Sequence, residues 1–231
     1  MSLVYQLFLR KFLFSLEPEV AHDMTCFLLS KGERSILLRK FLTRLTRTKG
    51  KSIRLFGLSF PNCIGLAAGL DKNGQFSGLS SSLGFGHVEV GTVTPLAQPG
   101  NPKPRLFRYE KEEALVNRMG FNNRGANALV KRLRLTNPKG ARLSPVGINI
   151  GKGANTTIDN AIEDYLDAFS VVASQADYIT INISSPNTSG LRDLHQDEFL
   201  HPLLESVRSK NLQWAKENEC CPLPCLLKIS P

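Results

Sequence analysis

The chain has 231 residues, of which 42% are hydrophobic and 21% charged, a composition that excludes a predominantly disordered protein. Its net charge of +9 is unevenly distributed: residues 1–54 carry 11 basic and 4 acidic side chains, whereas residues 55–231 carry 18 and 16. Because the larger part is close to neutral, we expect no nucleic-acid partner.

The cysteines and histidines indicate no metal site. The cysteine count is odd, and the cluster "CCPLPC" lacks a paired C-x-x-C spacing. The four histidines show no ligand spacing either. We expect reduced thiols in a cytosol-like compartment at Cys26, Cys63, Cys220, Cys221 and Cys225.

The N-terminal segment, residues 1–50, is predicted to form amphipathic helices. The run "VYQLFLRKFLFSL" is interrupted by Arg10 and Lys11 and is too short to span a bilayer. A second helix is expected from Pro18, since proline is tolerated in a first turn, and a third, basic helix follows. Apolar faces with basic flanks are typical of interfacial membrane helices. The alternative is a helical extension docked on its own domain.

The main domain, residues 51–231, alternates short apolar runs with candidate helices. We expect strands at 63–69, 87–92, 145–151, 178–184 and 224–230, with helices at 73–83, 123–135, 158–175 and 196–217. This order predicts an α/β fold of parallel βαβ units. A (β/α)8 barrel and a doubly wound sheet both fit, but no G-x-G-x-x-G follows the first strand.

Polar residues follow each predicted strand. In both parallel architectures, ligands bind at the carboxyl ends of the strands. Neutral amides and hydroxyls there suit a planar, hydrogen-bonding ligand such as the edge of a pyrimidine or a flavin. The most conspicuous example is "NISSPN", in which a strand ends in Ser184, Ser185, Pro186 and Asn187.

Six stretches carry a resemblance to a known family. They are "GLAAGLDKNG", "GFGHVEVGTVTPLAQPGNPKPRLFR", "NRMGFNN", "GINIGK", "NISSPNTSGLR" and "LLKISP". In this order they resemble dihydroorotate dehydrogenase, and the N-terminal helices with the serine of "NISSPN" resemble its quinone-dependent, membrane-associated class. The resemblance implies a (β/α)8 TIM barrel that oxidises dihydroorotate to orotate in pyrimidine biosynthesis, with FMN as hydride acceptor and a membrane quinone as final oxidant.

The resemblance also implies roles for individual residues. Ser185 is the expected catalytic base, and Pro186 is expected to fix its turn. The expected substrate-binding residues are Lys72, Asn117, Arg118, Met119, Gly120, Phe121, Asn182 and Asn187. The expected flavin-binding residues are Ala68, Gly69, Leu70, Asp71, Lys72, Thr92, Asn149, Asn182 and Lys228. His22 and Arg108 are expected to line a quinone tunnel.

The chain ends after its fifth predicted strand, whereas an eight-stranded barrel takes about 250 residues. We therefore expect only the first five βα units, without strands six to eight and the phosphate site that such strands form. A chain of this kind, expressed alone, is expected not to retain FMN. It could be part of a longer enzyme, the inactive product of an interrupted gene, or a fragment complemented by a separate C-terminal half.

Two further alternatives concern function and location. A membrane-surface binding module without turnover remains open, while another FMN barrel oxidoreductase fits "NRMGFNN" and "NISSPN" less well. Because the first helix begins so near Met1, we expect a peripheral protein on the cytoplasmic face of a bacterial inner membrane rather than one with a mitochondrial presequence. In a eukaryote, the mitochondrial inner membrane is the expected place.

Overall fold

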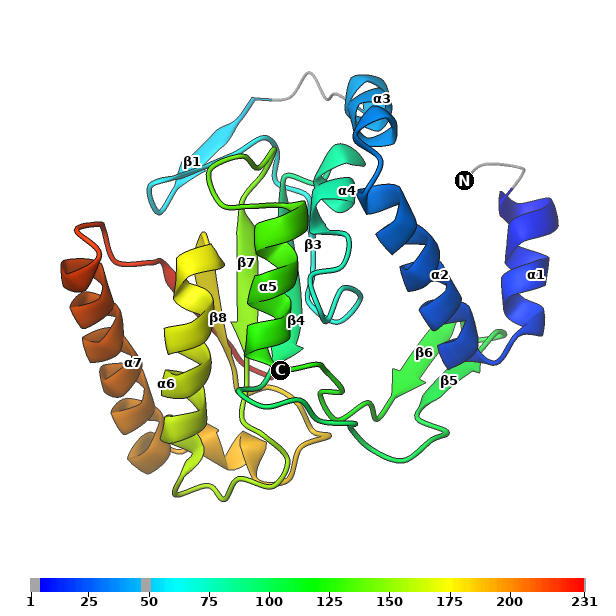
Figure 1. Ribbon diagram of the computed structural model, residues 1–231. Coiled ribbons are helices and arrows are strands. Elements are labelled where there is room, and N and C mark those ends of the chain that lie inside the picture. Colours follow the sequence, from blue (N-terminus) through cyan, green and yellow to red (C-terminus); the bar gives the residue numbers. More distant parts are fainter. Residues whose placement is uncertain (1–4, 47–50, 231) are drawn as a thin grey trace.

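A computed structural model describes residues 5–46 and 51–230. The boundary expected at residue 50 lies outside these ranges. The described part is an α/β structure with a parallel sheet, two small hairpins and an N-terminal group of helices (Figure 1).

The central sheet has five parallel strands in the order β3-β4-β7-β8-β9. Each of the five predicted apolar runs contributes one strand. The bounds are β3 Gly65–Leu66, β4 His87–Val93, β7 Val146–Ile150, β8 Tyr178–Asn182 and β9 Cys225–Lys228.

The helices between the strands are α4 (Ser77–Ser82), α5 (Ala126–Thr136), α6 (Ala161–Val172) and α7 (Asp197–Glu217), with short 3-10 turns η2 (Ala173–Gln175) and η3 (Leu191–His195). The helix expected from residue 73 begins only at Ser77, because the Asp71 carboxylate accepts hydrogen bonds from the backbone of Gln75 and Phe76 and holds that segment as a loop. The helix expected from residue 123 begins at Ala126, after Gly125 with φ +82°.

Alternation along the strands separates an apolar face from a polar face. The apolar side chains of β4, β7 and β8 form one core with α5, α6 and α7, which lie together over one face of the sheet (Figure 1). Ile148 and Ile179 are fully buried there. The opposite face of the same strands carries Glu89, Asn149 and Thr180, and these residues build the site described below.

Two antiparallel hairpins were not expected. One pairs β1 (Ile53–Leu55) with β2 (Leu58–Phe60), and the other pairs β5 (Leu106–Tyr109) with β6 (Ala114–Asn117). The second hairpin matters for function, because β6 ends at a predicted substrate residue and β5 contacts helix α2.

The N-terminal segment forms η1 (Tyr5–Leu9), α1 (Arg10–Ser15), α2 (Pro18–Glu33) and α3 (Ile36–Thr46). Pro18 lies in the first turn of α2, as expected, and Glu17 caps that helix by accepting the Val20 N–H. Within residues 5–46 and 51–230, no helix has both the length and the apolar character needed to cross a bilayer. Helix α2 packs on α4 through Cys26 and Leu79, so part of this segment docks on its own domain.

A buried carboxylate reinforces that docking. Glu33, at the end of α2, is only 3% exposed, and it accepts hydrogen bonds from the backbone N–H groups of Gly78 and Leu79 in α4. Arg39 of α3 lies 3.7 Å away. Burial raises the pKa of Glu33 to about 7, against the opposing effect of Arg39 and the two backbone donors.

This raised pKa predicts a pH-dependent stability. The contribution of a carboxyl group with a raised folded-state pKa is fully present below the ordinary value of 4.5 and is lost as the pH rises towards about 7. Relative to the Glu33→Gln variant, we expect the free energy of unfolding of the wild type to fall between about pH 4.5 and about pH 7.5. Urea unfolding at both pH values measures this difference.

The matched control for this experiment is Glu205→Gln, which removes an exposed ion pair with Arg208. Such a pair contributes little to stability. If the free energies of unfolding of the wild type and of Glu33→Gln change identically with pH, the raised pKa of Glu33 is contradicted.

Candidate active site

Three polar side chains meet at the carboxyl ends of the central strands. The Thr92 hydroxyl donates to Asn149 Oδ1 at 2.5 Å, and Asn182 Nδ2 donates to Thr92 Oγ1 at 2.9 Å and to Asn149 Oδ1 at 3.1 Å. All three residues are buried, with exposures between 0% and 6%. The sequence therefore correctly predicted that side chains from β4, β7 and β8 share one place, since parallel strands end on the same edge.

A backbone irregularity aims Thr92 into this cluster. The pairing of β4 with β7 shifts between Gly91 and Val93, which is the signature of a β-bulge at Thr92. Gly91 has φ +110°, and a Cβ atom there would lie 2.4 Å from the carbonyl oxygen of Asn149. Only glycine therefore permits this close approach of the two strands.

A carboxylate that the sequence analysis did not single out orients the amides. Glu89 Oε1 accepts from Asn149 Nδ2 at 2.8 Å, and Glu89 Oε2 accepts from the Thr180 hydroxyl at 2.9 Å. Because Glu89 accepts only, it fixes the amide group of Asn149 with its oxygen towards Thr92 and Asn182. The only signal in the sequence was an acidic residue inside the apolar run "HVEVGT".

The turn at residues 68–72 lies against this cluster. Gly69 N donates to Gly91 O at 2.9 Å, and Gly91 N donates to Asp71 O at 3.1 Å. The space where a Cβ of Gly69 would lie is open. Burial lowers the pKa of Lys72, while the nearby carboxylates of Asp23 and Glu19 oppose this effect. The predicted cofactor residues of this turn therefore lie beside the strand-end amides.

Two loops bring the predicted substrate residues together. Asn187 Nδ2 donates to the Asn117 carbonyl at 3.3 Å, although 70 residues separate them. Gln98, which the sequence analysis did not name, donates to the carbonyl oxygens of Gly120 and Phe121 at 3.0 and 3.2 Å. The Phe121 ring lies against Gly151, where a Cβ would be 3.0 Å from it and 2.8 Å from the Thr92 methyl group. The substrate loop thus borders the amide cluster.

The two serines of "NISSPN" have different partners. The Ser184 hydroxyl donates to Asn182 Oδ1 at 2.8 Å, which gives it a structural role at the strand end. Ser185 Oγ accepts the backbone N–H of Asn187 at 3.2 Å, as in a turn that presents a hydroxyl. Ser185 is only partly buried.

The remaining predicted residues occupy the borders of the site. Lys228 pairs with Asn182 in the β8–β9 register and is exposed. The Arg118 guanidinium donates to the Pro104 carbonyl at 2.9 and 3.1 Å, so it holds a neighbouring loop. Met119, which follows Arg118 in the chain, is partly buried. In the described part of the chain, no cluster of three or more His, Cys, Asp or Glu residues could hold a metal ion.

A cavity of about 830 Å³ lies between the N-terminal helices and the β5–β6 hairpin. His22 of α2 and Arg108 of β5, both predicted tunnel residues, line it, and so does Leu70 of the adjacent turn. Arg108 donates to the carbonyl oxygens of Phe14 and Leu16 at 3.2 and 3.4 Å, and it stacks on the Phe14 ring at 4.2 Å. Leu70 connects this cavity with the turn that borders the strand-end cluster.

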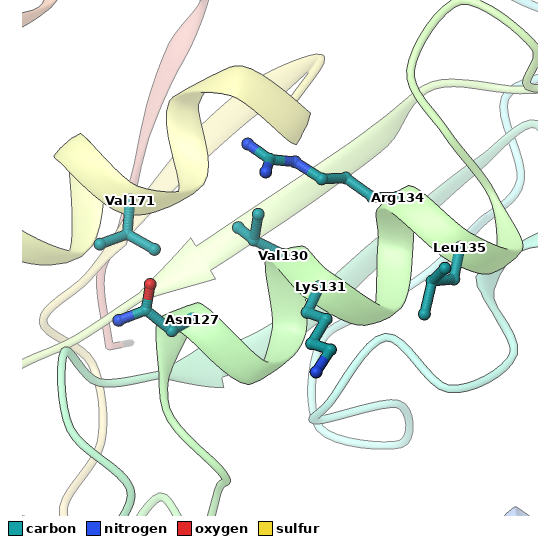
Figure 2. A pocket seen from close by; sticks show the side chains of 6 residues that line it. All are labelled: Asn127, Val130, Lys131, Arg134, Leu135 and Val171. Atoms are coloured by element: carbon teal, nitrogen blue, oxygen red, sulfur yellow. The ribbon is translucent and has the colours of Figure 1, made fainter.

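A second hollow of about 550 Å³ lies on the outer surface between α5 and α6. Figure 2 shows Asn127, Val130 and Arg134 of α5 facing Val171 of α6. This hollow lies on the helical layer, and the strand-end residues described above do not line it.

A parallel sheet with helices over one face and a polar cluster at its strand ends is typical of α/β proteins that bind their ligands at that edge. The sequence model described as dihydroorotate dehydrogenase matches residues 52–231. The chain therefore belongs to the dihydroorotate dehydrogenase family, and its parallel α/β architecture fits the TIM barrel of that family.

Individual relatives agree with this assignment. Dihydroorotate dehydrogenase (quinone) of Idiomarina loihiensis is 48% identical over 96% of this chain and 64% of its own length. The protein of the same name from Delftia acidovorans is 44% identical over 100% and 66%. The chain thus spans just under two thirds of these relatives. The crystal structure of DHODH from Eimeria tenella in complex with ferulenol superposes with a TM-score of 0.79 at 36% identity, over 92% of this chain and 59% of that one.

The role of Glu89 gives a testable prediction. Glu89→Gln replaces one acceptor oxygen by a donor facing Asn149 or Thr180, and a hydrogen bond to a charged group contributes about 1.5–3 kcal/mol. We expect a decrease of about 2 kcal/mol in the free energy of unfolding, measured by urea denaturation. Glu112→Gln, at an exposed position of the β5–β6 hairpin, serves as control. Equal free energies of unfolding of the two variants would refute the role of Glu89 in orienting the amides.

Proposed function

We propose that this chain carries the substrate-binding part of an enzyme that oxidises dihydroorotate to orotate in pyrimidine biosynthesis, with a flavin and a membrane quinone. The observation that supports it most directly is the contact between the loops of Asn117 and Asn187. Together with Asn182, they supply amide donors and acceptors that match the alternating polar edge of a pyrimidine. Lys72 adds a cation that suits the substrate carboxylate.

The residues present suit FMN as the flavin. Thr92, Asn149 and Asn182 form a buried polar cluster, the open turn at Gly69 lies beside it, and Lys228 adds a cation on the neighbouring strand. A flavin held by these residues would supply the acceptor for the hydride that the substrate loses. The Lys228 ammonium is suited to stabilise negative charge on the reduced pyrimidine ring of the cofactor.

Within this mechanism, Ser185 removes the proton from C5 of dihydroorotate. A free hydroxyl is a weak base, so its position and neighbours must activate it. Pro186 restricts the backbone of Ser185, and the hydrogen bond from Asn187 N to Ser185 Oγ leaves the hydroxyl proton free to donate elsewhere.

The cavity between the N-terminal helices suits the quinone. Its wall combines apolar side chains with His22 and Arg108, which can donate hydrogen bonds to quinone carbonyl oxygens. Leu70 belongs to both this wall and the turn expected to hold the flavin. This shared residue supports an arrangement in which the turn separates the quinone from the flavin, with the substrate on the far side of the flavin.

The outer faces of α2 and α3 suit a membrane surface. Ile36, Leu37, Phe41 and Leu45 are exposed by 64–81%, and basic residues flank them. Such a face enters the boundary of the acyl chains while the cations meet anionic head groups. We place the protein at the cytoplasmic face of a bacterial inner membrane, attached peripherally.

A further part of the barrel completes the enzyme. The chain spans 64% of the length of the Idiomarina loihiensis relative, and all four residues of β9 are exposed at the edge of the sheet. We propose that the described sheet comprises the first five βα units, that a sixth strand pairs with the free edge of β9, and that an eighth strand pairs with β3 and closes the barrel. Those strands belong to the same polypeptide or to a separate C-terminal half.

Complementation tests the catalytic proposal. We expect the chain alone to lose FMN on purification, and the chain co-expressed with the C-terminal third of the Idiomarina loihiensis relative to retain the flavin absorbance band. Dihydroorotate then bleaches this band, and Ser185→Ala slows bleaching about 100- to 10,000-fold while orotate still binds.

Ser189→Ala is the matched control, because this exposed serine lies in the same loop. Flavin that the complemented protein retains but dihydroorotate does not reduce would refute the proposed reaction. A stoichiometric flavin on the chain alone would instead refute the need for the additional strands.

Membrane attachment is tested separately. We expect the Leu37→Asp/Phe41→Asp variant to lose most of its binding to vesicles of phosphatidylglycerol and phosphatidylethanolamine in a flotation assay, because the charged side chains prevent insertion of the apolar face. Leu135→Asp removes an equally exposed apolar side chain on α5 and serves as control. Equal flotation of both variants would exclude α3 as the attachment surface.

A further inference from the structure

The side chain of Asn101 joins the two substrate loops. Its Nδ2 group donates to the Arg118 carbonyl at 2.9 Å and to the Asn187 carbonyl at 3.3 Å. An amide group has two N–H donors, and here both serve loops that lie 69 residues apart in the chain. Asn101 itself belongs to neither loop, and the sequence motifs assigned it no role.

The backbone around Asn101 fixes this arrangement. Asn101 N donates to the Met119 carbonyl at 3.0 Å. The preceding Gly100 has φ +73°, and a Cβ there would lie 2.3 Å from the same Met119 oxygen. A side chain at position 100 would thus force the substrate loop away from Asn101.

An ion pair between Arg105 and Glu19 of helix α2 holds residues 99–101 from the other side. Arg105 Nη1 donates to the carbonyl oxygens of Pro99 and Asn101 at 2.6 and 2.8 Å. Its Nε and Nη2 groups donate to the Glu19 carboxylate of α2 at 2.8–3.2 Å. Both side chains are buried, and Lys103 approaches Glu19 to 3.2 Å.

The charges of this pair are retained on burial. Burial opposes ionisation of Glu19, but hydrogen bonds from Arg105 and Lys103 outweigh it and hold the pKa of Glu19 below its ordinary value. Breaking such a buried pair by removing one partner is more costly than the net contribution of the pair itself. The Glu19–Arg105 contact is therefore a firm anchor between α2 and residues 99–101.

We propose that Asn101 is a positioning residue for the substrate site, and that the Glu19–Arg105 ion pair sets its place from helix α2. The class of ligand is the planar anionic pyrimidine of the proposed function, on which this inference rests. Glu19 lies one helical turn before His22, on the helix that lines the cavity proposed for the quinone. This helix therefore contacts Arg105, which binds the Asn101 backbone. The Asn101 side chain in turn binds both substrate loops.

Hydrogen exchange tests the geometry without any ligand. Asn101→Asp preserves the size of the side chain but removes both donors and places a carboxylate against two carbonyl oxygens. We expect the amides of residues 117–121 and 184–190 to exchange about tenfold faster, while those of β7 and β8 do not change. Glu19→Gln should act in the same direction with about a threefold effect. Asn127→Asp on the outer face of α5 is the matched control and should change neither loop.

Orotate binding to the complemented protein tests the role in the site. We expect Asn101→Asp to weaken orotate binding about tenfold, measured by calorimetry, and saturating orotate to restore protection of both loops. If the loops of Asn101→Asp exchange as in the wild type, or if β7 and β8 lose protection to the same extent, the inference is overturned. A wild type that binds no orotate would instead refute the proposed function, whatever the exchange result.

Discussion

The arrangement of the polar side chains at the carboxyl ends of the strands depends on the carboxylate of Glu89. It receives hydrogen bonds from β7 and β8 at once, through Asn149 and Thr180. An amide can be turned by 180° at little steric cost, so without a pure acceptor at this point the direction of Asn149 would be undefined. The oxygen of Asn149 then accepts from Thr92 and Asn182, and Asn182 in turn accepts from Ser184. The Glu89 carboxylate therefore determines which atoms donate and which accept in the hydrogen bonds at the strand ends. These bonds join Asn149, Thr92, Asn182 and Ser184.

The sequence predicted the elements whose pattern is periodic and missed those that depend on single contacts. Every strand of the central sheet appeared as an apolar run, and in β4, β7 and β8 the outward side chains pack on α5, α6 and α7. The start of α4 could not be placed, because serine- and glycine-rich sequence fits a helix as well as a loop until the Asp71 carboxylate binds the loop backbone. The β5–β6 hairpin is too short and too exposed to show a two-residue alternation.

The same distinction applies to the site. Asn117, Asn182 and Asn187 were named because they lie in the motifs that carry the family resemblance, and the structure shows that Asn187 contacts the Asn117 backbone. Glu89 and Asn101 were not, because their importance lies in partners 60–91 and 17–86 residues away. Spacing along the chain contains no information about such contacts. They become visible only when the fold has placed three loops and a strand next to one another.

The sequence left two interpretations of the N-terminal segment open, and the structure is compatible with both. A helical extension docked on its own domain and a membrane-facing segment seemed exclusive, but an α-helix has two sides. Glu19, Cys26 and Glu33 bind α2 to the main domain through one side, whereas Phe27 and Leu28 remain more than half exposed on another. Docking by buried ion pairs and backbone hydrogen bonds leaves these apolar side chains exposed, as the proposed membrane contact requires. It also gives the cavity between these helices a fixed wall, which a loosely attached anchor would not provide.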